Sequence, residues 1–532
     1  MRTIIGASGI VASGLVLMPM AALAEGREVQ TISFLTWPAS NYQHYYETSN
    51  YIAESWRELG LDVQLDPQPF PSPMVSMWFT EHKFDVVMSV LSGSPARLDP
   101  EFFTVNQFAK INDKPGGGNV GGFHSEQFEA LIPEQRKLYD PDARRAVVLE
   151  MQKVIYDEQP EGLIAAVVNT MAINTDRVKL AEYQPSPDGV RSVWNMLNME
   201  SLVDGPVKLG WTIDQDSWNP LVFKTLEDLD RLGLIYDRLV VTGPDGKPRM
   251  WAAESIEVVD DTTIEAVLRD GLTFSDGKPV TAEDVAFTFR FLKEKEAAYF
   301  RSVLESLADV AVDGNRVRFT LTEPSASFVS LALGQLPILP KHVWETMDAP
   351  HDFKNTEQPV GSGPWTLSHW RQGQEISFVR RPDHFMQPKA DVLMVQFGSA
   401  EVLAAALRSG EIGVSLQPIV PTVVEEFATQ ANLQLIQAQS NGHMSARYNI
   451  RSEPFSHKAL RQALGWAIPR EQIIEDVLGG DAVAIATPLV PANAFWSDPE
   501  LAVQEYDLDK ARAILTEAGF TWGDNGRLRY PE

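Results

Sequence analysis

The sequence predicts a protein in which α-helices and β-strands are mixed, of the α/β or α+β class. Segments with strand-like alternation and segments with helical spacing follow one another along the whole chain. The chain has 532 residues, 44% of them apolar, which is long enough for two or three cores because a single core stops growing near about 250–300 residues. This mixture excludes an all-β secreted scaffold.

Charge and cysteine content exclude several classes of function. The chain carries 45 basic and 72 acidic side chains, a net charge of −27, and no cysteine. So negative a charge argues against nucleic acid or anionic lipid as the main partner. Without cysteine there is no disulfide framework, thiolate zinc site, iron–sulfur cluster or cysteine nucleophile.

The first 24 residues have the pattern of a cleavable signal peptide. Arg2 is followed by an apolar run from Ile4 to Leu23, which ends in the small-x-small pattern Ala22-Leu23-Ala24. We therefore expect export to the periplasm as a soluble protein, with an uncleaved anchor as the alternative. A lipid anchor is not expected, because no cysteine stands at the cleavage point.

The first part of the chain shows four clear elements. Tyr51–Leu59 is expected to be a helix stopped by Gly60, and residues 61–65 alternate as a strand does. Phe84–Val90 is a short apolar run that suits a buried strand. Asp142–Asp157 has apolar residues at helical spacing.

The second part begins with a predicted strand at Lys208–Ile213, followed by two strands within Ile256–Leu268. Further signals are a capping box at Thr281-Ala282-Glu283-Asp284, a hairpin turn at Asp313-Gly314, helix starts at Ser456 and Asp507, and a left-handed helix end at Gly519. Strands and helices thus remain mixed to the end of the chain.

Motifs of known catalytic chemistry are missing from the sequence. It contains no G-x-S-x-G elbow, no complete set of S-x-x-K with S-D-N and K-T-G, no P-loop and no H-E-x-x-H pair. We therefore expect a binding protein rather than an enzyme, with no metal and no cofactor. Aromatic residues at loop positions can line a ligand cleft, although for any one of them core packing is the more frequent role. They are Trp37, Trp211, Trp218, Trp365, Trp370, Trp466, Trp496 and Trp522.

Several motifs resemble the family 5 extracellular solute-binding proteins of ABC transporters, the dipeptide and oligopeptide group. The most specific is Leu268–Val285, LRDGLTFSDGKPVTAEDV. Others follow in family order at Leu339–Trp344, Val360–Trp365, Arg461–Leu464 and Tyr506–Phe520. The resemblance implies a two-lobe α/β fold of the class II periplasmic-binding-protein type, with mixed sheets and a hinge. It implies a monomer that captures a solute between its lobes and delivers it to a membrane permease.

The order of these motifs departs from the family. They begin near residue 207, whereas residues 28–200 resemble the family's C-terminal part, so the chain reads as a circular permutant with the family's ends joined near 198–208. The prediction is one continuous lobe at 88–413 and one split lobe, 25–87 plus 414–532, that carries both ends. A tandem duplication with lost pieces is the alternative, although the two parts complement rather than repeat each other.

The resemblance also implies ligand-binding positions, each of which could equally be a loop residue without ligand contact. The candidates are Asp216, Trp218, Asn219, Tyr448, Asn449, Leu91, Ser92 and Ser94.

Peptide-binding members of the family tend to carry a tryptophan followed by an aspartate that holds the peptide amine. Here the equivalent stretch, residues 90–95, has no acid, and a buried ammonium without a carboxylate partner is costly. A peptide, modified peptide, oligosaccharide, opine-like compound or metal chelate therefore all stay open as the solute. Other classes of function are a secreted hydrolase with an unmarked carboxylate pair, or a sensory or chaperone-like binding protein.

Overall fold

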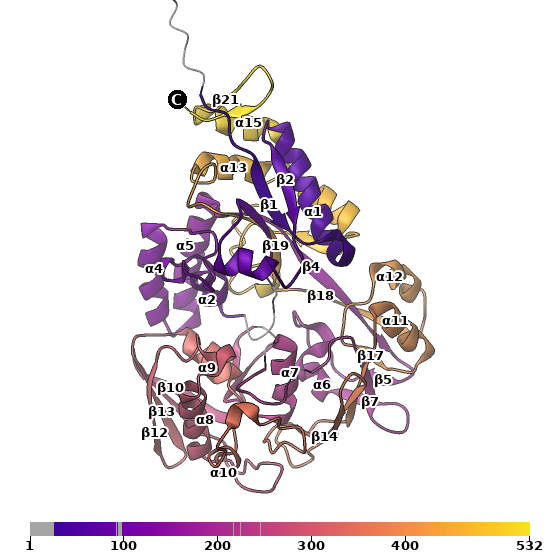
Figure 1. The fold of residues 1–532 in the computed structure, drawn as a ribbon. Coiled ribbons are helices and arrows are strands. Elements are labelled where there is room, and N and C mark those ends of the chain that lie inside the picture. The colour runs from indigo at the N-terminus through magenta and orange to yellow at the C-terminus, as the bar shows by residue number, and fades with distance from the viewer. Residues whose placement is uncertain are drawn as a thin grey trace, which may run out of the picture.

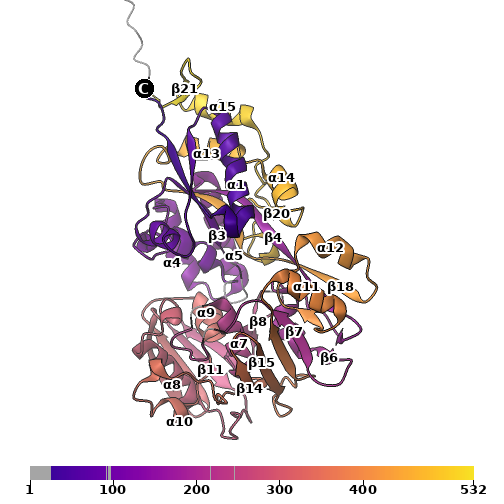
Figure 2. The same ribbon diagram turned by 45° about the vertical axis from the view of Figure 1, so that its right-hand side comes forward.

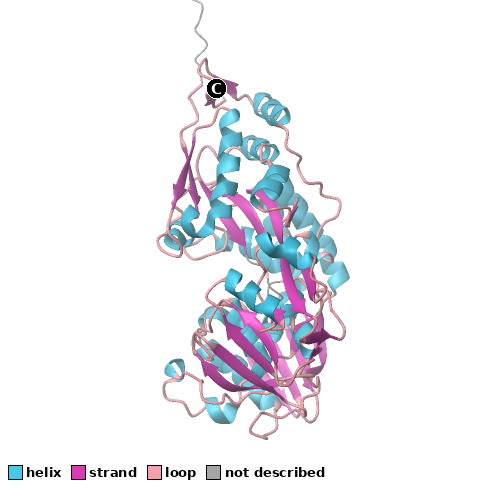
Figure 3. Ribbon diagram, turned by 90° about the vertical axis from the view of Figure 1, so that its right-hand side faces the viewer, coloured by secondary structure: helices cyan, strands magenta, loops and turns pink. Residues whose placement is uncertain are grey.

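The computed structural model shows two lobes stacked one above the other (Figure 1). It describes residues 26–91, 93, 98–215, 217–223, 225–244 and 246–531. Seen from the side, the lobes are joined along one side of the molecule, and helices flank the strands in both (Figure 3). The signal-peptide prediction for residues 1–24 lies outside the described residues.

The upper lobe contains the first and the last parts of the chain. Its sheet is built on the parallel pairs β1–β2 and β1–β3 and on the antiparallel pair β3–β19. Its strands are β1 (Ile32–Thr36), β2 (Val63–Pro67), β3 (Val86–Leu91), β19 (His443–Tyr448), β20 (Ala482–Ala484), β21 (Thr521–Trp522) and β22 (Leu528–Arg529). Its helices are α1 (Ala39–Glu58), α2 (Pro100–Phe103), α3 (Val105–Phe108), α4 (Glu126–Lys137), α5 (Pro141–Glu158), α13 (Lys458–Trp466), α14 (Arg470–Gln472) and α15 (Leu508–Glu517).

The lower lobe is continuous in sequence and has two main sheets (Figure 2), beside the two-stranded pairs β5–β6 and β8–β9. The larger sheet runs β14-β15-β16-β7-β17 and continues through β4 into the upper lobe, and the smaller one runs β10-β11-β13-β12. The strands are β5 (Val178–Leu180), β6 (Met199–Ser201), β7 (Val207–Trp211), β8 (Val240–Thr242), β9 (Pro248–Met250), β10 (Ala253–Asp260), β11 (Thr263–Leu268), β12 (Leu307–Asp313), β13 (Arg316–Leu321), β14 (Trp365–Arg371), β15 (Glu375–Arg380), β16 (Val392–Gln396), β17 (Val414–Ser415) and β18 (Leu433–Gln439). The helices are α6 (Val193–Leu197), α7 (Leu226–Ile235), α8 (Ala282–Glu294), α9 (Ser327–Gln335), α10 (Lys341–Trp344), α11 (Ala400–Ser409) and α12 (Pro421–Ala428).

One long strand, β4 (Glu161–Asn174), belongs to both lobes. Its first part pairs with β19 in the upper lobe and its last part with β17 and β18 in the lower lobe. The chain returns to the upper lobe between β18 and β19, where the N–H of Ser440 donates to the carbonyl of Val167 (2.9 Å). The lobes are therefore joined by two adjacent crossings.

The hydrophobic cores divide the chain differently from the sequence prediction. Buried apolar clusters of residues 29–166 and 444–530 form the upper lobe, and clusters of residues 171–436 form the lower lobe. The predicted lobe boundaries, 87/88 and 413/414, are wrong. The first boundary lies between residues 166 and 171 and the second between residues 436 and 444. The reason is strand pairing: β3 pairs with β1, which keeps the residues after it in the upper lobe, and β17 pairs with β7.

The first and last described segments pair with each other in the upper lobe. The N–H of Val29 donates to the carbonyl of Leu528 (2.8 Å), and the N–H of Tyr530 donates to the carbonyl of Arg27 (2.9 Å). The two ends of the described chain are thus neighbours, at the top of Figure 1.

Candidate functional site at the junction of the lobes

The parallel strands of both lobes end toward the crossings. In the upper lobe, β3 ends at Leu91, opposite His443, the first residue of β19 after the crossing. In the lower lobe, the chain after β17 leads to Ile419, whose N–H donates to the carbonyl of Thr170 in β4 (2.8 Å). Ligands of open α/β sheets bind outside the carboxyl ends of the strands, so both lobes offer that edge to the same junction.

Four aromatic rings gather just beyond the carboxyl ends of β1 and β2. We call Trp37, Tyr42, Tyr45 and Phe70 the aromatic cluster. The ring of Trp37 lies 4.7 Å from Tyr42, 5.2 Å from Tyr45 and 4.4 Å from Phe70, between centroids.

The cluster is anchored inside and open outside. Trp37 is 7% exposed and its indole N–H donates to the carbonyl of Met88 (3.0 Å), whereas Phe70 is 39% exposed. Burial raises the pKa of the Tyr45 phenol to about 12. Such a cluster offers a rigid apolar surface to a planar or apolar part of a ligand.

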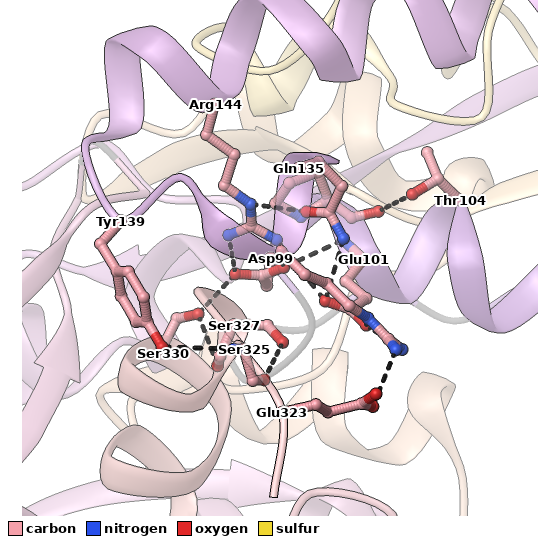
Figure 4. A network of polar contacts seen from close by, with 12 residues as sticks. Asp99, Glu101, Thr104, Gln135, Tyr139, Arg144, Glu323, Ser325, Ser327 and Ser330 are labelled. Carbon is pink, nitrogen blue, oxygen red and sulfur yellow. Dashed lines mark hydrogen bonds and ion pairs between the residues drawn. The ribbon is translucent and has the colours of Figure 1, made fainter. Parts of the chain in front are cut away.

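A polar network fills the space where α2, α4 and α5 meet the lower lobe (Figure 4). Asp99 caps α2 by accepting a hydrogen bond from the N–H of Glu101 (2.9 Å). The Arg144 guanidinium donates to both oxygens of Asp99, at 2.9 and 2.8 Å, and both side chains are at most 4% exposed. Gln135 accepts from Nε of Arg144 (2.8 Å). Burial alone would raise the pKa of Asp99, but the Arg144 charge and the donated hydrogen bonds outweigh it and lower that pKa.

The same carboxylate is shared with the lower lobe. Oγ of Ser330 in α9 donates to Oδ2 of Asp99 at 2.5 Å. Further contacts between the lobes lie around it. They are Ala326 N–H to the Arg136 carbonyl (2.8 Å), Ser325 N–H to the Tyr139 hydroxyl (3.2 Å), the Tyr139 hydroxyl to the Asp261 carbonyl (2.9 Å), and Arg136 Nη1 to Glu323 Oε1 (3.2 Å).

A second buried carboxylate lies on β4 beside β19. Oε2 of Glu161 accepts hydrogen bonds from Ser445 Oγ (2.7 Å) and Arg447 Nε (3.0 Å). Nε2 of His443 is 3.7 Å from Oε1 of Glu161, beyond hydrogen-bonding distance, and neither ring nitrogen of His443 has a partner among the described residues. Burial would raise the pKa of Glu161, but the Arg447 charge outweighs it, with His443 adding to the effect, and the pKa is about 2.

Two of the predicted ligand-binding residues, Trp218 and Asn219, belong to the core of the lower lobe. Trp218 is fully buried and meets Trp370 and Phe378 edge to face, at 6.2 and 5.9 Å between ring centroids. The side-chain amide of Asn219 is occupied by three backbone groups: the carbonyls of Pro350 (2.7 Å) and Phe353 (2.8 Å) and the N–H of Leu221 (2.9 Å).

Three others lie in the upper lobe, at the two ends of one strand pair. Tyr448 stacks on Phe455 at 4.9 Å, and its burial raises the pKa of its phenol. Asn449 donates to the carbonyl of Phe84 (3.0 Å). Leu91 lies at the other end, toward the crossings, five residues from the partner of Tyr448 and so about 16 Å away along the strand.

The remaining predicted positions, Asp216, Ser92 and Ser94, lie outside the described residues. In the part of the chain that the structure describes, no three or more His, Asp or Glu side chains are arranged to hold a metal ion. No described helix combines the length and the apolar character needed to span a membrane.

Comparison with known proteins shows the family to which the chain belongs. A model of the bacterial extracellular solute-binding proteins, family 5 Middle, matches residues 247–532, more than half of the chain. The chain belongs to this family. Its members are binding proteins, which agrees with the lack of a catalytic motif in the sequence.

Two curated relatives are similar to this chain over part of their length. One is the oligopeptide-binding protein AppA of Bacillus subtilis, 30% identical, with 57% of this chain and 58% of the relative covered. The other is the dipeptide-binding protein of Escherichia coli, 28% identical, with 58% and 62% covered. The chain thus spans about three fifths of the length of the relatives it matches. Among solved structures, AppA of Bacillus subtilis in complex with a nonapeptide is 25% identical, with 60% and 65% covered and a TM-score of 0.47.

Sequence reasoning missed the polar network between the lobes. Asp99 and Ser330 are 231 positions apart, and neither has a local pattern that sets it apart from a capping or a surface residue. Asp99 and Pro100 start α2, but nothing in the sequence pointed from them to α9. Trp37 was recognised as a loop tryptophan, without the three rings around it.

Proposed function

We propose that this family 5 protein is the solute-binding component of an ABC importer, which captures a small solute between its lobes and delivers it to a membrane permease. The observation that carries the proposal is the junction: two separately packed lobes, joined by two adjacent crossings, offer the carboxyl ends of their parallel strands to the same place. Two adjacent connections of this kind permit hinge closure.

In this function no covalent bond is broken. Selection rests on the shape of the closed site and on the cost of leaving polar groups unpaired by a wrong solute. The protein is therefore proposed to be a monomeric binding protein and not an enzyme. Export by the signal peptide would place it in the periplasm, beside its permease.

We propose that the solute is peptide-like or another small polar compound with a planar or apolar part. The aromatic cluster supports the apolar part, since Phe70 is exposed at its edge. Leu91, at the carboxyl end of β3, is the described candidate that best fits a ligand contact, and Ser92, Ser94 and Asp216 keep this role through the family resemblance. Trp218, Asn219, Tyr448 and Asn449 instead hold the cores in place.

We also propose that the chain is a circular permutant of family 5. The pairing of residues 27–29 with 528–530 supports a family order in which the last segment continues into the first. The family match, which starts at residue 247 and runs to residue 532, supports it too. In this order the lower lobe carries the joined family ends near 198–208, and the upper lobe carries both ends of the present chain.

The first experiment is native mass spectrometry of the protein purified gently from the periplasm. A stoichiometric extra mass would identify the solute. Bare protein that shows no thermal shift with peptides, oligosaccharides, opine-like compounds or metal chelates would contradict solute capture.

A variant then tests the aromatic cluster. Phe70→Ala is expected to weaken binding of the identified solute about ten-fold, since one partly exposed ring is worth about 1–2 kcal/mol. The matched control is Tyr506→Ala, an equally exposed aromatic (46% against 39%) that packs near Ser55, away from the carboxyl ends. Equal affinities of the parent protein, Phe70→Ala and Tyr506→Ala would show that the aromatic cluster does not contact the solute.

Relinking the chain tests the permutation. New ends are placed in the exposed turn at residues 202–205, and residue 530 is joined to residue 26 by a short linker. The relinked protein is expected to fold with the same thermal stability and solute affinity, and its sequence to match family 5 relatives over most of their length. Failure of the match to extend through residues 26–205 would overturn the permuted order.

A further inference from the structure

The lobes touch at a place distinct from the two crossings. Asp99 of the upper lobe accepts the Ser330 hydroxyl hydrogen of the lower lobe at 2.5 Å. This is the short distance typical of a hydrogen bond from a hydroxyl to an ionised carboxylate, which is about twice as strong as a neutral one.

The upper-lobe half of this contact is fixed before the lower lobe arrives. Asp99 is held by two hydrogen bonds from Arg144 and by its capping bond to the N–H of Glu101. Arg144 is in turn held by Gln135. All of these residues are buried in the upper lobe, so little side-chain freedom is lost when Ser330 docks.

The lower-lobe half is the first turn of α9 and the residues before it. The backbone N–H groups of Ser325 and Ala326 donate to Tyr139 and to the Arg136 carbonyl. These N–H groups near the helix start thus find neutral acceptors in the upper lobe, and among the described groups of α9 only the Ser330 hydroxyl reaches the Asp99 carboxylate. Figure 4 shows Ser325, Ser327 and Ser330 facing Asp99 and Tyr139 from the α9 side.

We propose that Asp99 and Ser330 form a latch that holds the two lobes together on the α4–α9 side of the molecule. The two crossings, through β4 and between β18 and β19, connect the lobes covalently. The latch is a non-covalent contact, which must break when the lobes part. Its effect on the spacing of the lobes stands by itself, while its effect on solute retention rests on the proposed function.

The test compares two variants of nearly equal shape. Ser330→Val removes the hydroxyl, and Ser330→Thr keeps it. Because the chain has no cysteine, spin labels attach only at Glu54→Cys in the upper lobe and Glu305→Cys in the lower lobe, both exposed positions. Pulsed electron spin resonance then gives the distance between the lobes in solute-free protein.

The expected result is a longer and broader distance distribution for Ser330→Val, with Ser330→Thr close to the parent protein. Ser409→Ala, which removes a hydroxyl that donates only within α11 to Ala406 (3.0 Å), serves as the control and is expected to change nothing. Identical distributions for Ser330→Val and Ser330→Thr would overturn the latch.

The solute readout separates this proposal from the proposed function. For the solute found by mass spectrometry, Ser330→Val is expected to bind about ten-fold more weakly. If no solute is found, solute capture fails, but the distance measurement still decides whether the latch exists.

Discussion

Two buried arginine–carboxylate pairs in the upper lobe have similar burial and different surroundings. Asp99 and Arg144, at the contact between the lobes, have partners for both carboxylate oxygens and for all three guanidinium nitrogens. Glu161 and Arg447, on the sheet near the crossings, leave Oε1 of Glu161 without a hydrogen-bond partner among the described residues.

The two pairs therefore differ in whether all their polar atoms are hydrogen-bonded. A buried polar network stabilises a structure when every member is satisfied, and each unsatisfied atom takes away from that stability. The Asp99 pair is completed by a residue of the other lobe, Ser330. The Glu161 pair keeps an acceptor free beside His443, close to the place where we expect solute.

The largest effects should come from removing the arginines. Arg144→Met and Arg447→Met each leave a buried carboxylate without its cation, and each is expected to lower the free energy of unfolding by about 3–5 kcal/mol. Urea unfolding followed by tryptophan fluorescence measures this. Arg371→Met, in a surface pair where the arginine is 66% exposed, is the control and should cost about 1 kcal/mol or less. A similarly small loss in Arg447→Met would mean that the Glu161 site is hydrated.

Acid should reveal the Glu161 pair next. The pKa of the Glu161 carboxyl falls from 4.5 to about 2 on folding, so the folded state binds the proton less tightly than the unfolded state. The resulting stability, about 3 kcal/mol, is fully present above about pH 4.5 and is lost as the pH falls toward about 2. The measurement is the free energy of unfolding at pH 7 and at pH 3. Glu161→Gln should lose this part of the pH dependence, and an unchanged slope in that variant would contradict the assignment.

Local structure followed from the sequence where short-range chemistry decides it. The capping box at Thr281 begins α8, the Asp313-Gly314 turn joins β12 to β13, and Asp507 caps α15. Gly60 and Gly519 have φ of +88° and +86°, as expected of residues that end helices. In each case the signal and its consequence lie within a few residues.

The site followed from the sequence only in part. The candidate positions derived from the resemblance stay predictions, and the amides of Asn219 and Asn449 are taken up by backbone groups that are far away in sequence, such as the carbonyl of Phe353. The lobe boundaries differ from the predicted ones because β4 runs through both lobes and pairs with strands of each. Strand pairing between distant segments decides these points, and no local pattern encodes it.

Two histidines sharpen the comparison between satisfied and unsatisfied groups. His384 uses both ring nitrogens, with Asp237 at 3.1 Å and the N–H of Met386 at 3.1 Å, whereas both nitrogens of His443 lack partners among the described residues. His384→Leu is therefore expected to cost about 1–3 kcal/mol, because it strips a donor from buried Asp237, and His443→Leu about 1 kcal/mol or less. Thermal unfolding of the two variants measures this. Equal losses would show that His443 is satisfied in solution.

The smallest effect should come from the exposed Arg136–Glu323 ion pair beside the latch. Arg136 and Glu323 pair across the lobes at 3.2 Å, but their side chains are 27% and 61% exposed, so water and salt screen the attraction. Glu323→Gln is expected to lower stability by about 0.2–1 kcal/mol at low salt, and by less at about 1 M salt, where the Debye length falls to about 3 Å. The interlobe distance should stay unchanged, because the buried bond from Ser330 to Asp99 remains. If the lobes separate in Glu323→Gln as far as in Ser330→Val, the exposed Arg136–Glu323 pair contributes as much to holding the lobes together as the bond from Ser330 to Asp99.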